Sequence, residues 1–185
     1  MVVIKRVSAK TIPDTRNEKT ISVSLITNIG EFSASAPNGK SRGKYENDPY
    51  KKNIESDIKK LKDFSDYFSD EKLEEFSDLT RVEDIIKDTV GANTLFAFES
   101  AVLKAIAKEQ KKEIWQLVNP HAKKFPRLLG NAIEGGKHSH ADKHPDFQEF
   151  LQEFSRLRKH ERGFSFCTWM FFEKLLFILL HLLFS

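Results

Sequence analysis

Three segments within the first 36 residues alternate apolar and polar side chains with a period of two. They cover residues 2–9, 21–27 and 31–36. In the second segment, Ile21, Val23 and Leu25 would share one face, which is typical of a strand with one buried side. Asn28 and Gly30 supply a turn before the third segment. We therefore expect a three-stranded antiparallel sheet to open the protein.

The apolar spacing then changes to three or four residues, which is typical of amphipathic helices. We expect helices over residues 50–68, 70–76, 80–90 and 94–110. In the third, Thr80 and Glu83 have the spacing of a capping box. The fourth contains neither glycine nor proline. Four such helices could cover one face of the sheet, which predicts an α+β domain over residues 1 to about 125.

The chain changes character after Pro120. A lysine-containing stretch resembles a linker, residues 127–133 have the pattern of a short strand, and Gly135 and Gly136 end it. Helical spacing returns at residues 147–157. The final 22 residues, 164–185, hold 6 of the 16 phenylalanines and form a strongly apolar tail.

Length and charge limit the function classes. A chain of 185 residues allows one full domain, or a small domain plus a fragment. The net charge is only +3 and the basic residues are interleaved with acidic ones, which argues against nucleic acid as a partner. Cys167 is the single cysteine, which fits a reducing compartment. Residues 1–12 lack an apolar signal-peptide core, so we expect a cytoplasmic protein.

We expect residues 37–49 to form a loop that could bind an anionic ligand. Gly39 and Gly43 would let the backbone approach a ligand, and Lys40, Arg42 and Lys44 offer positive charge to a phosphate or carboxylate. The alternative interpretation is a solvated basic loop without a ligand.

Five residues of metal-ligating types recur at every second position between residues 138 and 146. They are His138, His140, Asp142, His144 and Asp146. On an extended segment they would face one way and could hold a transition metal. The spacing matches no structural zinc pattern, and Pro145 interrupts a strand, so a polar surface loop is the other interpretation.

Four stretches resemble motifs of the enolase family. DTRNEKT at 14–20 is similar to a DSRGNPT turn, and APNGKSRGKYE at 36–46 is similar to a loop with the pattern PSGASTGxYE. GAN at 91–93, followed by AVLKA at 101–105, resembles GANAxLxVSxAxAKA. NAIEGGKH at 131–138, then QEF at 148–150, resembles NVINGGxHA and QEF. The four stretches occur in the family's order.

The resemblance implies a fold and a reaction. It implies an enolase-like N-terminal domain at residues 1–125 and the start of a (β/α)₈ barrel at 126–160, with 164–185 as a tail unrelated to the family. The family's reaction is the reversible dehydration of 2-phosphoglycerate to phosphoenolpyruvate in glycolysis, with Mg²⁺ as cofactor.

The resemblance also assigns residue roles. Glu149 would be the catalytic glutamate that assists departure of the substrate hydroxyl; its other interpretation is a solvated carboxylate in the first turn of a helix. His138, Gln148, Lys40 and Arg42 would bind the substrate. Asn38 takes the place of a loop serine that brings oxygen ligands to the second Mg²⁺, and amide or backbone oxygens can ligate that ion.

The chain is too short for the whole barrel. A (β/α)₈ barrel takes about 250 residues, and 59 residues follow Pro126. The lysine base and the Asp/Glu/Asp metal ligands of the family lie on later barrel strands. We therefore expect an inactive chain from a truncated or frame-shifted gene. The alternative is a non-enzymatic degenerate fragment or a membrane-associated binding module.

Two partner expectations follow. Residues 164–185 are long enough for a membrane span of about 30 Å, and basic residues precede them, although Glu173 and Lys174 lie near the middle. The family is a homodimer in which the arginine matched by Arg16 pairs with a carboxylate of the other subunit's barrel. We expect this dimer to be lost here; the alternative places Arg16 in a solvated turn.

Overall fold

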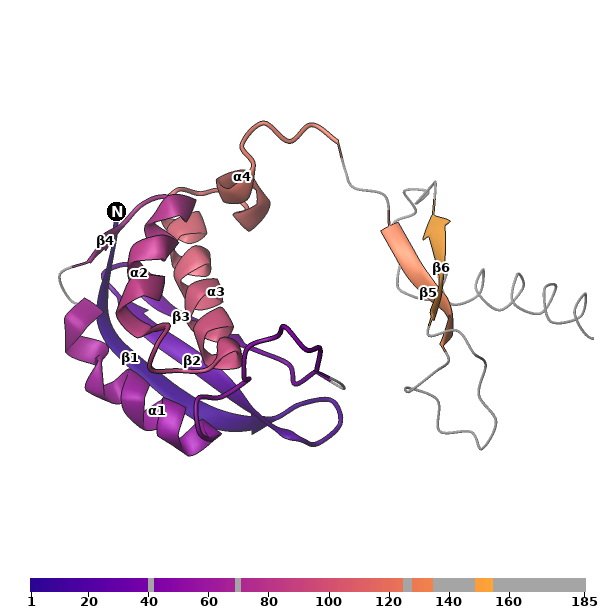
Figure 1. The fold of residues 1–185 in the computed structure, drawn as a ribbon. Coiled ribbons are helices and arrows are strands. Elements are labelled where there is room, and N and C mark those ends of the chain that lie inside the picture. Colours follow the sequence, from indigo (N-terminus) through magenta and orange to yellow (C-terminus); the bar gives the residue numbers. More distant parts are fainter. Residues whose placement is uncertain (40–41, 69–70, 125–127, 135–148, 155–185) are drawn as a thin grey trace, which may run out of the picture. The chain divides into compact units, whose positions relative to one another are not determined.

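The computed structural model describes residues 1–39, 42–68, 71–124, 128–134 and 149–154. The chain divides into two compact units, Met1–Ala122 and Lys123–Ser185. The first unit is an α+β domain (Figure 1).

A four-stranded antiparallel sheet forms the base of the first unit. Its strands are β1 (Val2–Pro13), β2 (Lys19–Thr27), β3 (Gly30–Ser35) and β4 (Lys72–Leu73). Their order is β3-β2-β1-β4. Ala9 pairs with Val23, which in turn pairs with Ala34, so the apolar positions of three strands coincide. The expected antiparallel strands and the turn before Gly30 are confirmed.

The fourth strand corrects the expectation of three strands and of a helix over residues 70–76. Lys72 and Leu73 pair with Val3 and Val2 at the start of β1. Leu73 is fully buried. A segment of about seven residues is too short to form a stable helix by itself, so pairing with the open edge of β1 and burial of Leu73 determine its structure.

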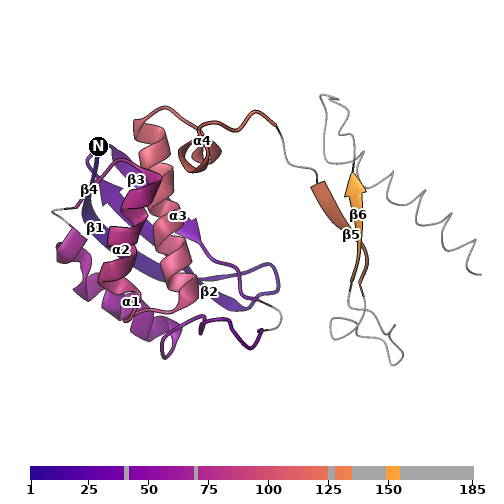
Figure 2. The ribbon, with the colours of Figure 1, turned by 45° about the horizontal axis from the view of Figure 1, so that its top comes forward.

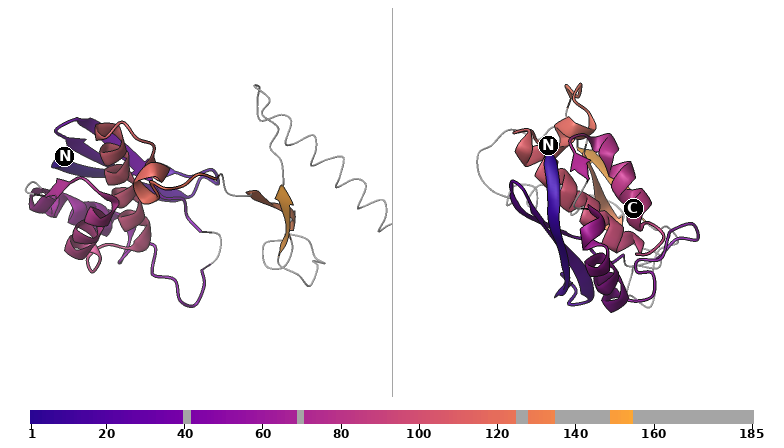
Figure 3. Two further views of the ribbon diagram at one scale, coloured as in Figure 1. Left: turned by 90° about the horizontal axis from the view of Figure 1, so that it is seen from above. Right: turned by 90° about the vertical axis from the view of Figure 1, so that its left-hand side faces the viewer.

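Helices cover the apolar face of the sheet. They are α1 (Ile54–Asp63), α2 (Leu79–Ile86), α3 (Ala92–Glu109) and the short α4 (Ile114–Val118), with 3₁₀ turns η1 (Ser65–Phe68) and η2 (Phe76–Asp78). Helix α3 packs on β2 and β3, and α1 and η1 pack on β1. Two layers are visible in Figure 2 and in the right-hand view of Figure 3.

The core lies between these layers and confirms the two sequence periods. Ile21, Val23 and Leu25 of β2 are fully buried, as are Phe98 and Val102 of α3. The opposite face of the sheet carries small polar side chains. Its members on the first three strands include Ser8, Ser22, Ser24, Ser33 and Ser35.

Several helix boundaries differ from the expected ones. The helix expected to begin at residue 50 begins at Ile54, and the helix expected to end at residue 90 ends at Ile86. The helix expected over 50–68 ends at Asp63, and Ser65 begins a 3₁₀ turn in which its hydroxyl accepts a hydrogen bond from the Val7 backbone N–H at 2.9 Å. The helix expected to begin at Thr80 begins at Leu79, because η2 leads directly into it. Thr80 is therefore not an N-cap, and the Thr80–Glu83 capping box does not form.

The buried carboxylate of Asp57 joins α1 to the start of α3. Asp57 is 0% exposed. Its Oδ2 accepts hydrogen bonds from the Gly91 backbone N–H at 2.8 Å and from the Thr94 hydroxyl at 2.7 Å. Its Oδ1 accepts one from the Lys51 backbone N–H at 3.2 Å. A buried carboxylate is tolerated when donors surround it in this way.

A close backbone contact accompanies this carboxylate. A Cβ atom on Gly91 would overlap the backbone of Pro49 and Tyr50, so glycine is required there. The Ala92 N–H donates to the Asp48 carbonyl at 2.9 Å, and the Asn93 N–H donates to the Pro49 carbonyl at 3.0 Å. The first amides of α3, which have no partner inside the helix, are thus satisfied by the end of the 37–49 loop.

In the second unit, the described residues form a hairpin. Strand β5 (Leu128–Glu134) pairs antiparallel with β6 (Glu149–Phe154). The strand expected over 127–133 is confirmed from Leu128 onward, and the helix expected over 147–157 is wrong for Glu149–Phe154, which form a strand. Backbone pairing along the whole of β5 outweighs a local periodicity of one short segment. The hairpin by itself does not confirm a barrel.

The Asp57 carboxylate gives a first prediction. Asp57→Asn replaces one acceptor oxygen by an NH₂ group that faces an N–H donor, so the free energy of unfolding should fall by about 2 to 3 kcal/mol. Urea unfolding followed by far-UV circular dichroism measures the change. Asp63→Asn, at the exposed end of the same helix, is the matched control and should change it by less than about 0.5 kcal/mol. Equal effects of both substitutions would contradict the assigned role.

A second prediction concerns Glu99 of α3. Burial, and then the negative charge of Glu83 on α2, raise the pKa of Glu99. A raised folded-state pKa means that stability is present below the unfolded-state pKa and is lost as the pH rises through the folded-state pKa. Glu99→Gln should therefore raise the melting temperature at pH 7 and leave it unchanged near pH 4. Glu83→Gln should give a smaller gain of the same sign, and a Glu99→Gln effect that is constant with pH would refute the assignment.

Candidate functional site

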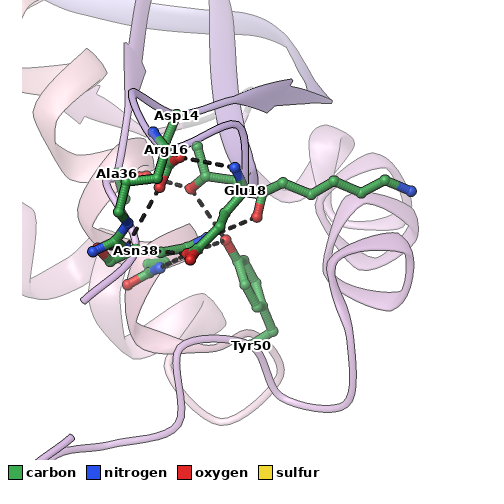
Figure 4. A network of polar contacts seen from close by, with 9 residues as sticks. Asp14, Arg16, Glu18, Ala36, Asn38 and Tyr50 are labelled. Atoms are coloured by element: carbon green, nitrogen blue, oxygen red, sulfur yellow. Dashed lines mark hydrogen bonds and ion pairs between the residues drawn. The ribbon is translucent and has the colours of Figure 1, made fainter. Parts of the chain in front are cut away.

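Three of the four stretches that resemble enolase motifs meet at one place in the first unit. Arg16 comes from the 14–20 turn, Asn38 from the 36–46 loop and Asn93 from the start of α3. Figure 4 shows Arg16, Asn38 and Tyr50 within one network of polar contacts. These residues are far apart in sequence, so the network joins the β1–β2 turn, the loop base and α3.

The 14–20 turn is held by the Asp14 carboxylate. Its Oδ1 accepts hydrogen bonds from the backbone N–H groups of Arg16 at 2.8 Å and Glu18 at 2.9 Å. Asn17 lies between them with a positive φ of 60°, a conformation that asparagine tolerates better than most residues. The turn therefore presents the Arg16 side chain toward the loop base (Figure 4).

Arg16 has partners within its own chain. Its guanidinium lies 3.0 Å from the Glu18 carboxylate and 3.6 Å from the Asp14 carboxylate, and it donates to the Asn38 backbone carbonyl at 3.0 Å. The side chain is 38% exposed. Arg16 is thus neither unpaired nor buried in an apolar surface within this unit.

Asn38 uses both ends of its side-chain amide. Its Nδ2 donates to the Lys19 carbonyl at 2.8 Å. Its Oδ1 accepts from the Tyr50 hydroxyl and from Asn93 Nδ2, each at 3.2 Å. Next to it, the Thr20 hydroxyl donates to the Ala36 carbonyl and lies 3.2 Å from the Tyr50 hydroxyl.

The other predicted site residues are spread over both units. Arg42 is an exposed side chain that forms an ion pair with Asp48, six residues later in the same loop. Glu149 begins β6, opposite Glu134 of β5. Glu149 therefore lies on a strand, and the interpretation of a carboxylate in the first turn of a helix is wrong.

Three predicted substrate-binding residues lie outside the described residues. They are Lys40, His138 and Gln148, and the histidine and aspartate series at 138–146 and the apolar tail at 164–185 lie there too. The serine that follows Lys40, Ser41, matches the second serine of the family's loop pattern and is also among them. The structure therefore assigns them no geometry.

The described residues do not fit a Mg²⁺ site. Within the ranges given above, no group of three histidine, cysteine, aspartate or glutamate side chains is placed to hold a metal ion. Both oxygens of Asn38 are already hydrogen-bond acceptors. We therefore assign no chemical step to a metal in this part of the chain.

Several residues of the network were not identified from the sequence. Asp57, Tyr50 and Asn93 are the main ones. Asp57 did carry a signal, because it falls three residues after Ile54 and four before Leu61, on the buried stripe of α1. A carboxylate on an apolar stripe indicates a buried polar partner. Asn93 was marked only as part of the GAN motif at 91–93, without a role, and Tyr50 gave no comparable signal.

Comparisons with known proteins identify relatives of the chain. No family model matches the sequence. The enolase of Methanothermobacter thermautotrophicus is 30% identical over 159 residues, and that of Methanosphaera stadtmanae is 30% identical over 161 residues. Each match covers 80% of this chain and 38% of the relative.

Two further facts bear on the expectations. Among the helices that the structure describes, none is long and apolar enough to cross a membrane. The chain spans 38% of the length of the curated relatives that it matches. The resemblance indicated by the four motifs is confirmed, and over four-fifths of its length the chain is an enolase-like sequence.

Proposed function

We propose that this chain corresponds to the N-terminal domain of an enolase with the beginning of the domain that follows it. The observation that carries the proposal is the 30% identity to two archaeal enolases over 80% of the chain. The complete protein would interconvert 2-phosphoglycerate and phosphoenolpyruvate, with the metal supplying charge stabilisation for the intermediate.

The 37–49 loop would supply positive charge to the substrate. Arg42 is 55% exposed, and its ion pair with Asp48 is a surface contact. Exposed pairs of this kind contribute little, typically less than about 1 kcal/mol. A substrate phosphate or carboxylate could therefore replace Asp48 as the partner of Arg42 at small cost. Lys40 would act with it.

The second unit would supply the groups nearest the reacting atoms. Glu149 would assist departure of the hydroxyl group as a general acid, and His138 and Gln148 would contact the substrate. The backbone of β6 fixes where Glu149 lies along its strand, opposite Glu134. A residue on a paired strand is better positioned than one on an isolated loop.

The 185 residues would not suffice for turnover. The family's lysine base and its Asp/Glu/Asp metal ligands match no stretch identified in this sequence, and the chain spans only 38% of its relatives. Without a base, proton abstraction next to the carboxylate has no acceptor. The loop and Glu149 would each supply groups for the reaction, and the remaining groups would come from the part of such a relative that this chain does not match.

A second candidate function follows from the apolar tail. Residues 164–185 could attach the chain to a membrane, in which case it would act as a membrane-associated binding module. Co-sedimentation with phosphatidylcholine vesicles, compared for the whole chain and for residues 1–163, tests this candidate. Equal sedimentation of both would exclude it.

The proposed function predicts activity in a chimera. Residues 1–154 of this chain should replace the matched part of the M. thermautotrophicus enolase and retain phosphoenolpyruvate formation, followed by absorbance. Glu149→Gln in that chimera should lower kcat by about 10² to 10⁴. Glu153→Gln, on the same strand, is the matched control and should retain activity.

The isolated 185-residue chain supplies the other half of the test. It should form no phosphoenolpyruvate above background with Mg²⁺ present, because the base and the metal ligands are missing. A folded but inactive chimera would contradict the assignment to enolase, and so would equal effects of the two substitutions. Mg²⁺-dependent turnover by the isolated chain would contradict the proposal that these 185 residues do not suffice for the reaction.

A further inference from the structure

Asn38 occupies a position where the family's loop pattern has serine, and the network of Figure 4 shows what its amide does there. We infer that Asn38 is a hydrogen-bond junction that fastens the base of the 37–49 loop to β2 and to the start of α3, and that it does not bind a metal. The inference rests on the contacts of Asn38 and is independent of the proposed activity.

The acceptor side of the junction is fully used. An amide oxygen has two lone pairs, and Asn38 Oδ1 accepts one hydrogen bond from the Tyr50 hydroxyl and one from Asn93 Nδ2. The two donors come from segments that are far apart in sequence but lie against each other, because Tyr50 follows the loop and Asn93 lies in the first turn of α3. A cation at Oδ1 would have to displace at least one of them.

The donor side and the backbone complete the junction. Nδ2 donates to the Lys19 carbonyl at 2.8 Å, which ties the loop to the first residue of β2. The Asn38 carbonyl accepts from the Arg16 guanidinium at 3.0 Å. Asp14 and Glu18 balance that positive charge in part. A divalent cation at the carbonyl would still face a guanidinium at contact distance, which disfavours it.

Serine could not make the same connections. A serine hydroxyl also has one donor and two lone pairs, but they sit on a single oxygen closer to the backbone. The longer amide of Asn38 separates the two functions, because Nδ2 donates to Lys19 while Oδ1 accepts from Tyr50 and Asn93. The difference from the family pattern therefore has a structural meaning, because asparagine links three separate segments through one side chain. It also removes the serine hydroxyl as a metal ligand at this position.

The end of the loop is also hydrogen-bonded to the start of α3. The amides of Ala92 and Asn93 donate to the carbonyls of Asp48 and Pro49, where the loop ends. If Asn38 is released, Tyr50 and Asn93 lose a common partner, and these two amides should open more often. Their hydrogen exchange therefore reports on the junction without any substrate or metal.

Hydrogen exchange of the full chain tests the junction. Asn38→Ser should speed exchange in the peptides containing Ala92 and Asn93 by about fivefold or more and lower the melting temperature by roughly 5 °C. Asn28→Ser is the matched control, because Asn28 also links strands through its amide, to Val3 and Met1, away from the loop. It should leave exchange at Ala92 and Asn93 unchanged. Equal exchange in wild type and Asn38→Ser would overturn the inference.

Magnesium titration of the melting temperature tests the absence of a ligand role. Any Mg²⁺-dependent shift of the wild type should be the same in Asn38→Ala, which has no side-chain oxygen, and in Asn28→Ala. Asn38→Gln keeps the amide but moves it by one methylene group, so it serves if the alanine variant does not fold; its Mg²⁺-dependent shift should also equal that of the wild type. A shift lost only in the residue-38 variants would show that residue 38 binds the metal.

Discussion

The first unit depends on one buried carboxylate. Asp57 lies on α1 and accepts hydrogen bonds from Gly91 and Thr94 at the start of α3, so it fixes where that helix begins. With the helix start fixed, the backbone N–H groups of Ala92 and Asn93 donate to the carbonyls of Asp48 and Pro49. The end of the 37–49 loop is thereby attached to the helix whose other face packs on β2 and β3.

This attachment explains why the polar network forms where it does. The backbone of Tyr50 lies against Gly91 at the end of the loop. The Tyr50 hydroxyl donates to Asn38 at the beginning of the loop. Asn93 reaches Asn38 from the same helix start. The enolase-like motifs of the first unit are thus neighbours because the helix start, the loop and the 14–20 turn share hydrogen bonds, although Asp57 itself belongs to none of those motifs.

The sequence was sufficient for elements whose side chains repeat over a long segment. The alternation through Ile21, Val23 and Leu25 predicted β2, and the stripe through Phe98 and Val102 predicted α3. It failed where long-range pairing decides a short segment. Leu73 enters a strand because β1 offers an open edge, and Glu149 enters a strand because β5 lies opposite. No window of local sequence contains either partner.

The candidate site, too, could be predicted only in part from the sequence. The motifs located the 14–20 turn, the loop and α3, but they did not indicate that Asn38 makes its contacts through both ends of its amide. Hydrogen-bond partners at long sequence separation follow from the fold and not from spacing. The resemblance therefore marked the turn, the loop and the helix start, and it did not predict which atoms their side chains contact.

The central claim is that the sheet, the helices and the Asp57 contacts form one domain that holds the enolase-like turn and loop together. Urea unfolding of residues 1–122 alone, followed by far-UV circular dichroism and by the fluorescence of Trp115, tests it most directly. The account predicts one cooperative transition with the same midpoint for both probes. A gradual loss of signal, or two different midpoints, would contradict it.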